Sequence, residues 1–337
     1  MKAVAYFESL AIDDPRALQD VELPEPVPGP RDLLVEVRAI SVNPVDTKVR
    51  RNTQPEAGQP KVLGWDVAGV VVGVGSEVSL FKAGDEVFYA GSIARAGGNS
   101  ERHLVDERIV GRKPRSLSFA EAAALPLTAI TAWELLFERL QLVEGQGAGQ
   151  QLLIVGAAGG VGSIMLQLAR QLTKVSMIAT ASRPETQAWA RELGAHHVID
   201  HSQPLHAELQ RAGFASVSHV ASLTQTDQHF DQLVEALTPQ GRLALIDDPA
   251  QPLDVMKLKR KSLSLHWELM FTRSLFETPD MIEQHHLLQR VSQLVDQGVL
   301  RTTLGEHFGT INAANLRRAH ALLESGKAKG KIVLEGF

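Results

Sequence analysis

The stretch Gln151-Leu-Leu-Ile-Val-Gly-Ala-Ala-Gly-Gly-Val-Gly162 decides the fold of this 337-residue chain. Its apolar start is typical of a buried strand, and a helical pattern follows at Ser163–Leu172. Glycines between a strand and a helix let backbone amides approach a pyrophosphate at the helix N-terminus. The usual G-x-G-x-x-G is incomplete, because Ala157 replaces its first glycine. We favour a dinucleotide-binding loop over a tight turn without a ligand, and expect its binding residues to be Ala158, Gly159, Gly160, Val161 and Gly162.

From Gln151 onward, strands and helices alternate. Apolar runs at Leu152–Val155, Val175–Ala179, Val217–Ala221 and Leu243–Ile246 are separated by helical patterns such as Thr226–Leu237. This alternation predicts an α/β domain with a doubly wound parallel sheet and helices on both faces.

A second glycine run, Gly69-Val-Val-Val-Gly-Val-Gly75, lies in a different context. No helical pattern follows it, so we expect a strand without a ligand. The first 120 residues contain short strands separated by Gly and Pro turns, which predict a small irregular β-barrel. At its end, Ser118 and Glu121 have the spacing of a capping box that opens a helix.

The C-terminal part continues the pattern with a strand, two helices and a closing strand. They are expected at Ser262–Trp267, Pro279–Gln297, Ala313–Glu324 and Lys331–Leu334.

The end of the second strand of the sheet distinguishes the two nicotinamide cofactors. NAD-binding sites usually place Asp or Glu there, whereas this chain has no acid before Glu185. Ser182 and Arg183 instead offer a hydroxyl and a guanidinium to a 2′-phosphate. The alternative is a capping serine and a solvated arginine before Pro184. The pattern favours NADPH.

Composition excludes several classes of site. The sequence has no cysteine, so disulfides, thiolate nucleophiles, cysteine-ligated zinc and iron–sulfur clusters are excluded. A formal net charge of −5 suggests no basic surface for nucleic acid. The apolar stretch Ala120–Phe137 is broken by Glu121, Pro126 and Glu134, so we expect no membrane span. No signal-peptide pattern opens the sequence, and we expect a cytoplasmic protein.

Several motifs occur in an order typical of one superfamily. They are Asn43-Pro-Val-Asp46, Gly64-Trp-Asp-Val-Ala-Gly69, Lys82-Ala-Gly-Asp-Glu-Val87, Ala124-Leu-Pro-Leu-Thr-Ala-Ile-Thr-Ala-Trp133 and the glycine loop. The chain therefore resembles the medium-chain dehydrogenase/reductase superfamily over essentially its whole length, in particular its zinc-independent quinone oxidoreductase branch. A similar group is called "zinc-type alcohol dehydrogenase-like".

The resemblance implies a domain organisation. It comprises a GroES-like β-barrel catalytic domain (residues 1–122), a Rossmann domain (123–267) and a C-terminal return to the catalytic domain (268–337). It further implies a nicotinamide cleft between the domains and a homodimer formed through strand 262–267.

The same resemblance argues against a metal. Zinc-dependent relatives place Cys, His and Cys at positions matching Asn43, Trp65 and about Leu127, and none of these three residues is a zinc ligand here. Histidines at 196, 197, 201 and 206 show no regular ligand spacing, and His285 and His286 cannot share a helix face. We expect solvated or locally bonded histidines and no metal.

The remaining site residues are assigned by the resemblance. Asn43 would donate to the acceptor oxygen, with a simple turn before Pro44 as the alternative. Asp46 either acts as the family's site acid, whose position it matches, or only fixes the loop. Lys48 is either a positive charge for the developing oxyanion or a surface lysine. Thr128 and Thr131 are expected near the nicotinamide and Lys331 near the cofactor phosphates. The substrate cleft is expected to include Trp65, Trp267, Met270 and Phe271, although apolar residues at such positions are equally typical of core.

These observations predict an NADPH-dependent, metal-free oxidoreductase. Without zinc, a Tyr–Lys pair or a nucleophile, the chain suits acceptors that are already electrophilic, namely quinones and α,β-unsaturated carbonyls. Two alternatives remain: an NADPH-binding sensor or structural protein with little turnover, and a zinc-type alcohol dehydrogenase.

Overall fold

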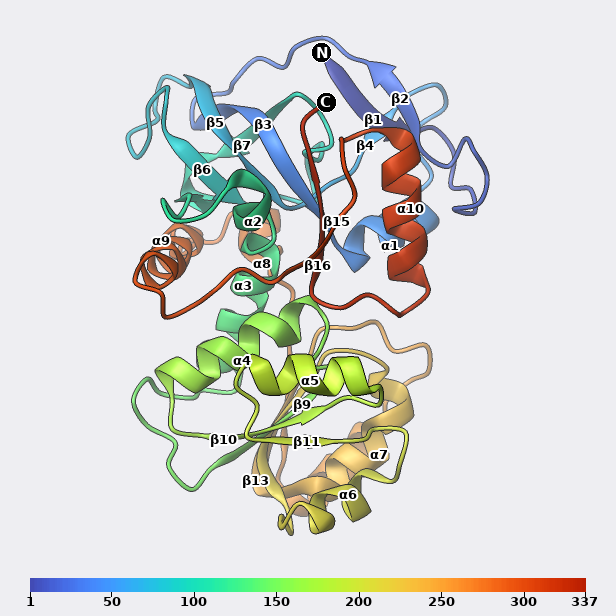
Figure 1. Cartoon of the computed structure of the whole chain (residues 1–337), viewed down its shortest axis with the longest axis vertical. Coiled ribbons are helices and arrows are strands. Elements are labelled where there is room, and N and C mark those ends of the chain that lie inside the picture. Colours follow the sequence, from blue (N-terminus) through green and yellow to red (C-terminus); the bar gives the residue numbers. More distant parts are fainter. The chain divides into compact units, whose positions relative to one another are not determined.

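The computed structural model describes all 337 residues, and the chain forms two compact units (Figure 1). The first unit contains Met1–Ile130 and Phe271–Phe337, and the second contains Thr131–Met270. The boundaries therefore fall later than the predicted ones at 122/123 and 267/268. Residues up to Ile130 belong to the first unit because the backbone there is tied to it, as the hydrogen bond from the Leu127 amide to Asp66 illustrates. Glu268 stays with the second unit because its amide donates to the Leu245 carbonyl.

Two sheets build the first unit. One is three-stranded and antiparallel in the order β2-β1-β4, formed by Gln19–Glu22, Lys2–Tyr6 and Lys61–Val62. The other has the order β15-β16-β3-β5-β6-β8 with β7 paired to β3, formed by Leu304–His307, Lys331–Glu335, Asp32–Val42, Val67–Val74, Glu86–Tyr89, Val110–Arg112 and Arg102–Asp106. The second glycine run lies in β5, so it is a strand of this sheet as predicted.

Helices of the first unit come from both ends of the chain. They are α1 (Pro44–Asn52), α2 (Phe119–Ala123), α8 (Thr272–Phe276), α9 (Glu283–Asp296) and α10 (Ala313–Glu324). The capping box at Ser118 is present: its hydroxyl accepts from the Glu121 amide at 3.2 Å and donates to the Glu121 carboxylate at 2.8 Å.

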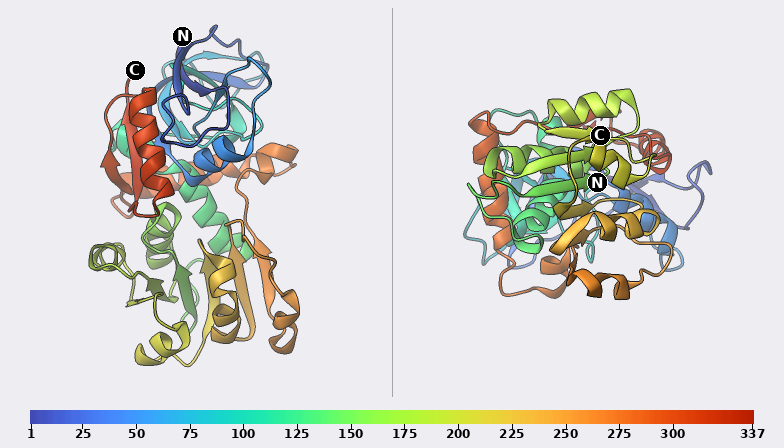
Figure 2. Two further views of the ribbon diagram at one scale, coloured as in Figure 1. Left: turned by 90° about the vertical axis from the view of Figure 1, so that its right-hand side faces the viewer. Right: turned by 90° about the horizontal axis from the view of Figure 1, so that it is seen from below.

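The C-terminal return is also present, because β16 pairs antiparallel with β3, Ile332 opposite Val42 (Figures 1 and 2). This pairing brings Lys331 beside the end of β3.

The second unit is an open parallel sheet in the order β11-β10-β9-β12-β13-β14. Its strands are His197–Ile199, Ser176–Thr180, Gln151–Val155, Val217–Ser222, Leu237–Leu245 and Ser264–Trp267. This is the order 3-2-1-4-5-6 of the doubly wound dinucleotide-binding fold. Because the order reverses between β9 and β12, the loop after β9 lies at the switch point where such sheets bind ligands.

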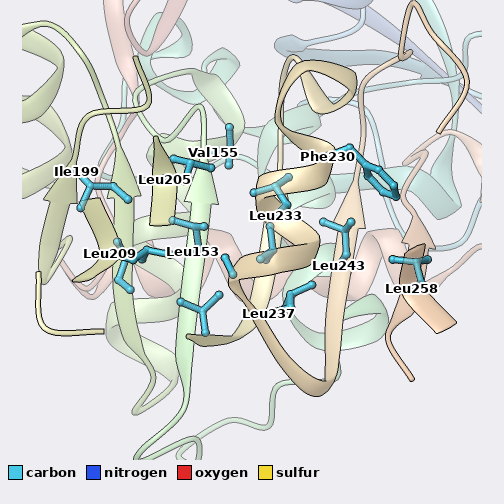
Figure 3. Packing of buried hydrophobic residues seen from close by; sticks show 14 residues of the cluster. Leu153, Val155, Ile199, Leu205, Leu209, Phe230, Leu233, Leu237, Leu243 and Leu258 are labelled. Atoms are coloured by element: carbon cyan, nitrogen blue, oxygen red, sulfur yellow. The ribbon is translucent and has the colours of Figure 1, made fainter. Parts of the chain in front are cut away.

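Helices α4 (Gly160–Leu172), α5 (Pro184–Glu192), α6 (Leu205–Arg211) and α7 (Thr226–Ala236) connect these strands. One core cluster buries apolar side chains of the sheet against α6 and α7, as Figure 3 shows for Leu153, Leu209, Leu233 and Leu243. This packing holds the strands in register and therefore fixes the ends of β9 and β10.

One continuous helical stretch, Phe119–Arg139, is long and apolar enough to cross a membrane by length and composition. It contains α2, α3 (Pro126–Trp133) and a π-helical segment at Glu134–Arg139. However, 83% of its apolar window is buried inside the protein, so it has the character of a core helix.

Candidate functional site

The glycine loop joins β9 to α4, as the sequence predicts. Gly159 is the N-cap residue of α4, has extended backbone angles (φ −72°, ψ −179°), and no side chain caps the helix. The amides of the first helical turn have no partner within a helix. Together with the positive end of the helix dipole, these amides provide a site for an anion.

The individual glycines of the loop have different requirements. A Cβ atom at Gly162 would lie 2.4 Å from the Ala157 carbonyl oxygen, so the protein's own packing demands glycine there. A Cβ atom at Gly159 would meet only the Gly156 carbonyl oxygen, at 3.4 Å. The fold does not need a glycine at 159, and its absent side chain leaves space beside the helix N-terminus. These features fit a pyrophosphate.

The end of β10 provides the second part of this region. β10 is hydrogen-bonded to β9, so the two carboxyl ends are adjacent. Thr180 is buried, and its hydroxyl accepts a hydrogen bond from the Gly156 amide at 3.2 Å, which ties the start of the glycine loop to β10. The sequence pattern did not single out Thr180; the available signal was a hydroxyl at the end of the strand next to the loop strand.

Ser182 and Arg183 follow directly after β10. Ser182 is exposed, and Arg183 is the N-cap residue of α5. The Arg183 Nε lies 2.9 Å from the Glu185 carboxylate, and both side chains are solvent-accessible. The end of β10 therefore presents a hydroxyl and a guanidinium, whereas the only nearby carboxylate in the sequence, Glu185, is paired with that guanidinium.

Two of the predicted catalytic residues, Asn43 and Asp46, lie in a buried polar network of the first unit. Asp66 and Lys331 complete this network, and each of the four residues is at most 3% exposed. Asn43 follows the last residue of β3 and is the N-cap residue of α1, and Asp46 on this helix accepts from the Asn43 backbone amide at 2.6 Å. The other Asp46 oxygen accepts from the Gly64 amide at 3.1 Å. Gly64 has a φ of +107°, which a residue with a side chain rarely adopts. Asp46 therefore fixes this loop, one of the two roles left open by the sequence.

Lys331 and Asp66 form the charged centre of the network. The Lys331 ammonium is 2.9 Å from the Asp66 carboxylate, and it donates to the Val42 carbonyl at 3.2 Å and to the Asn43 side-chain oxygen. Asp66 also accepts from the Asn43 side-chain amide and from the Leu127 backbone amide, both at 2.8 Å. All three protons of the ammonium are thereby used.

Burial dominates the electrostatics of both carboxyl groups. It raises the pKa of Asp46 to about 7, against the opposing effect of the Asn43 amide and Lys331. It also raises the pKa of Asp66, where Lys331 and the side-chain amide of Asn43 oppose the shift. Lys331 is thus the cationic group that opposes the raised pKa of both carboxyl groups.

Two predictions differ from this geometry. The Asn43 side-chain amide is directed at the carbonyls of Ser41 and Trp65 and at Asp66, so both of its protons are occupied within the protein. It is not available to donate to an acceptor oxygen in this arrangement. Lys331 is buried and bound to Asp66 and Asn43 rather than presented to phosphates. Both differences have the same physical cause. The buried Lys331 ammonium requires a carboxylate and oxygen acceptors, which Asp66 and Asn43 provide inside the protein.

The other predicted residues have simpler surroundings. Lys48 is half-buried on α1, and Thr128 and Thr131 are buried on α3, where the Thr128 hydroxyl donates to the Leu125 carbonyl. In the first unit, Trp65 is buried, donates from its indole to the Ser92 carbonyl at 3.1 Å, and packs edge-on against Phe271. In the second unit, Met270 is buried, whereas Trp267 is 52% exposed at the end of β14. Trp65, Phe271 and Met270 thus have the burial of core residues.

No group of three or more His, Asp or Glu side chains lies close enough together to hold a metal ion. Three of the histidines that are close in sequence have hydrogen-bond partners within the protein. His196 accepts from the Met177 amide at 3.0 Å, His206 is 2.9 Å from Gln210, and His285 donates to the Val110 carbonyl at 2.6 Å.

Comparisons with known proteins address the whole chain. Residues 29–132 match the model of the alcohol dehydrogenase GroES-like domain, and residues 193–334 match that of a zinc-binding dehydrogenase. A zinc-type alcohol dehydrogenase-like protein of Staphylococcus aureus is 36% identical over 99% of both chains. A quinone oxidoreductase of Pseudomonas aeruginosa is 32% identical over 96% of this chain and 97% of its own length. The chain belongs to the medium-chain dehydrogenase/reductase superfamily, in its quinone oxidoreductase-like branch.

Solved structures agree with this assignment. The structure of Escherichia coli quinone oxidoreductase complexed with NADPH has a TM-score of 0.86 and 26% identity, covering 99% of this chain and 100% of that one. A Rhizobium etli protein, described provisionally as a zinc-dependent alcohol dehydrogenase, has a TM-score of 0.96 and 59% identity, covering 100% of this chain and 98% of that one. The predicted fold, a GroES-like domain with a Rossmann domain, is confirmed. As a member of this superfamily the protein is an oxidoreductase, and the comparisons support a nicotinamide cofactor.

Proposed function

We propose that this protein is an NADPH-dependent, metal-free reductase of quinones or α,β-unsaturated carbonyls. The observation that carries the proposal is the end of β10, where Ser182 and Arg183 follow the strand and no unpaired carboxylate is available for a ribose 2′-hydroxyl. A planar guanidinium suits a phosphate, whereas NAD-binding members of the fold use an acid at this place. In this proposal the pyrophosphate lies against the first turn of α4, and Thr180 holds the loop in position.

The proposal of metal-free chemistry rests on the donor set. Asn43, Trp65 and Leu127 occupy the positions that correspond to the zinc ligands of zinc-dependent relatives. The Asn43 side-chain amide and the Trp65 indole already donate hydrogen bonds within the protein, and Leu127 contributes only its backbone amide. A catalytic zinc needs three protein ligands and an open position, and these residues do not fit one.

The bound cofactor would supply a hydride, which passes with its two electrons to the acceptor. The acceptor becomes a hydroquinolate or an enolate, and water supplies the proton that completes the reduction. Such acceptors need no Lewis acid because they are already electrophilic, so the protein's task is to orient the reactants and exclude competing reactions. Since the Asn43 amide is occupied, Lys48 on α1 is the remaining predicted group that could stabilise the developing negative charge.

The test is NADPH oxidation in the presence of a chelator, with a quinone and a simple enone offered separately and NADH as the cofactor control. We expect turnover that survives chelation and prefers NADPH. Turnover that is lost on chelation and restored by zinc would contradict the metal-free proposal. Saturable NADPH binding without oxidation by any acceptor would instead favour the sensor or structural protein.

We also propose a cytoplasmic homodimer. β14 is the terminal strand of the Rossmann sheet and pairs only with β13, so its outer edge is available to the same strand of a second copy. Light scattering coupled to size-exclusion chromatography measures the mass, and a monomer at micromolar concentration would contradict this proposal.

A further inference from the structure

The three positions that correspond to zinc ligands in zinc-dependent relatives are connected to one another in this protein by a single hydrogen-bonded group. The Asn43 side chain donates to the Trp65 carbonyl at 3.1 Å and to Asp66 at 2.8 Å. Asp66 in turn accepts from the Leu127 amide at 2.8 Å. The segment after β3, the segment before β5 and the first turn of α3 therefore meet at one carboxylate, which is fully buried.

We infer that Asp66 is a positioning residue that holds the first turn of α3 in place. The Asp66–Lys331 ion pair fixes the three segments that carry the zinc-ligand positions, as a bound metal would, but it is not a Lewis acid. This inference rests on the proposed metal-free function. The reduction needs fixed geometry rather than a strong electrophile, and an ion pair with directed hydrogen bonds supplies that geometry.

The Leu127 amide is the decisive contact. It belongs to the first turn of α3, where helix amides need acceptors from outside the helix, and in this buried place the Asp66 carboxylate is its acceptor. The same helix carries Thr128 and Thr131, which lie three residues apart and therefore on one face. Both threonines are at most 4% exposed. A shift of this turn would displace the face on which both predicted nicotinamide contacts lie.

Only a carboxylate satisfies all the donors around residue 66. One oxygen accepts from Leu127, and the other accepts from both Asn43 and Lys331. In Asp66→Asn, the single remaining oxygen would turn to Lys331, because a buried ammonium is the most costly group to leave unpaired. The amide nitrogen would then face the Leu127 N–H, donor against donor. This substitution should loosen the first turn of α3.

Hydrogen exchange of the full chain, read from peptides that cover residues 126–133, tests this directly. We expect faster exchange in Asp66→Asn than in the wild-type protein. The matched control is Glu107→Gln. Glu107 is also a buried carboxylate of the first unit, accepts from the Ser79 and Leu80 amides at 2.8 and 2.7 Å, and faces a cation, Arg31. The control removes a buried carboxylate of the same unit and should leave residues 126–133 at the wild-type rate.

The double variant Asp66→Asn with Lys331→Met separates positioning from general destabilisation. Without the ammonium, the one side-chain oxygen left at position 66 is free to accept from Leu127 again. Exchange at residues 126–133 should therefore return towards the wild-type rate, although a second buried contact has been removed. Exchange as fast as in the single variant, or faster, would overturn the inference.

Kinetics supply the functional readout. For Asp66→Asn we expect kcat for quinone reduction to fall about tenfold or more, since small misplacements of reacting groups are costly. The Kd for NADPH should change by less than about threefold, because the expected phosphate contacts belong to residues of the second unit that share no partner with Asp66. Wild-type kcat in Asp66→Asn would overturn the inference. If the wild-type protein reduces no acceptor, the proposed function fails, and the exchange experiment still decides whether Asp66 positions α3.

Discussion

The glycine-loop region of the second unit and the buried network of the first unit use polar groups in opposite ways. At the ends of β9 and β10, the helix amides are uncapped by side chains, Ser182 is exposed, and Arg183 is reached by solvent. Around Asp66, every polar group is buried and bonded to another group of the protein. The first arrangement suits a charged ligand that arrives from water, and the second suits a fixed framework. Residues matching a family's catalytic positions can therefore have a structural role.

The largest effect is expected from Lys331→Met, which tests whether the network is a framework. Removing one partner of a buried ion pair leaves an uncompensated charge, and we expect a loss of about 3–5 kcal/mol in the free energy of unfolding. Denaturant unfolding measured at pH 8 checks this. Lys331→Arg keeps the charge and should lose less. A loss below about 1 kcal/mol for Lys331→Met would show that the network contributes little.

The cost of Lys331→Met should also depend on pH. The folded-state pKa values of Asp46, about 7, and of Asp66 are raised above their unfolded values, so these groups favour folding most below pH 4 and lose that contribution as pH rises through the folded pKa. Lys331 lowers both folded-state pKa values. Without Lys331 these pKa values rise further, so the loss of folding stability continues to higher pH. The difference in stability between wild type and Lys331→Met should grow from pH 4 to pH 8. A difference that stays constant over this range would contradict the assignment of the charges.

Arg183→Met tests the open region. A hydrogen bond to a charged group contributes about 1.5–3 kcal/mol, so NADPH affinity should fall about 10–100-fold. NADH affinity should stay within about threefold of the wild-type value, because NADH has no 2′-phosphate. Fluorescence titration with both cofactors measures the two affinities. Equal losses for NADPH and NADH would mean that Arg183 contacts a part common to both.

Two glycine variants distinguish packing from ligand approach. Gly162→Ala places a methyl group against the Ala157 carbonyl and should destabilise the fold by about 1–3 kcal/mol. Gly159→Ala has room in the protein and an allowed backbone conformation, so it should change stability by less than about 1 kcal/mol. Its NADPH affinity should nevertheless fall about 10–100-fold, because the methyl group occupies the place of the phosphate. Unchanged affinity in Gly159→Ala would exclude close approach of the pyrophosphate to this residue.

The smallest effect is expected from Glu185→Gln. The exposed pair between Arg183 and Glu185 is worth about 0.2–1 kcal/mol, and the carboxylate competes with a 2′-phosphate for the guanidinium. NADPH should therefore bind about two- to fivefold more tightly to Glu185→Gln at low ionic strength, with no change for NADH. The effect should fade in high salt because the pair is exposed. Weaker binding would mean that Glu185 helps to orient Arg183.

Sequence alone determined the features that depend on local pattern. The β9–loop–α4 unit follows from an apolar run, glycines and a helical period, all contained in about 20 neighbouring residues. The alternation of strands and helices indicated the parallel sheet, and the absence of an acid after β10 identified the polar end at Ser182 and Arg183. The second glycine run, Gly69–Gly75, was assigned to a strand for the same reason, because no helical pattern follows it.

Only the tertiary structure decided the roles of Asn43, Asp66 and Lys331. Lys331 is 265 positions from Asp66, and they meet because β16 pairs with β3 and brings the C-terminal segment to the end of that strand. No local pattern shows whether an asparagine amide is free or already bonded, since that depends on which distant groups are buried with it. Burial forces polar groups to find partners inside the protein, and the identity of those partners is a property of the folded chain.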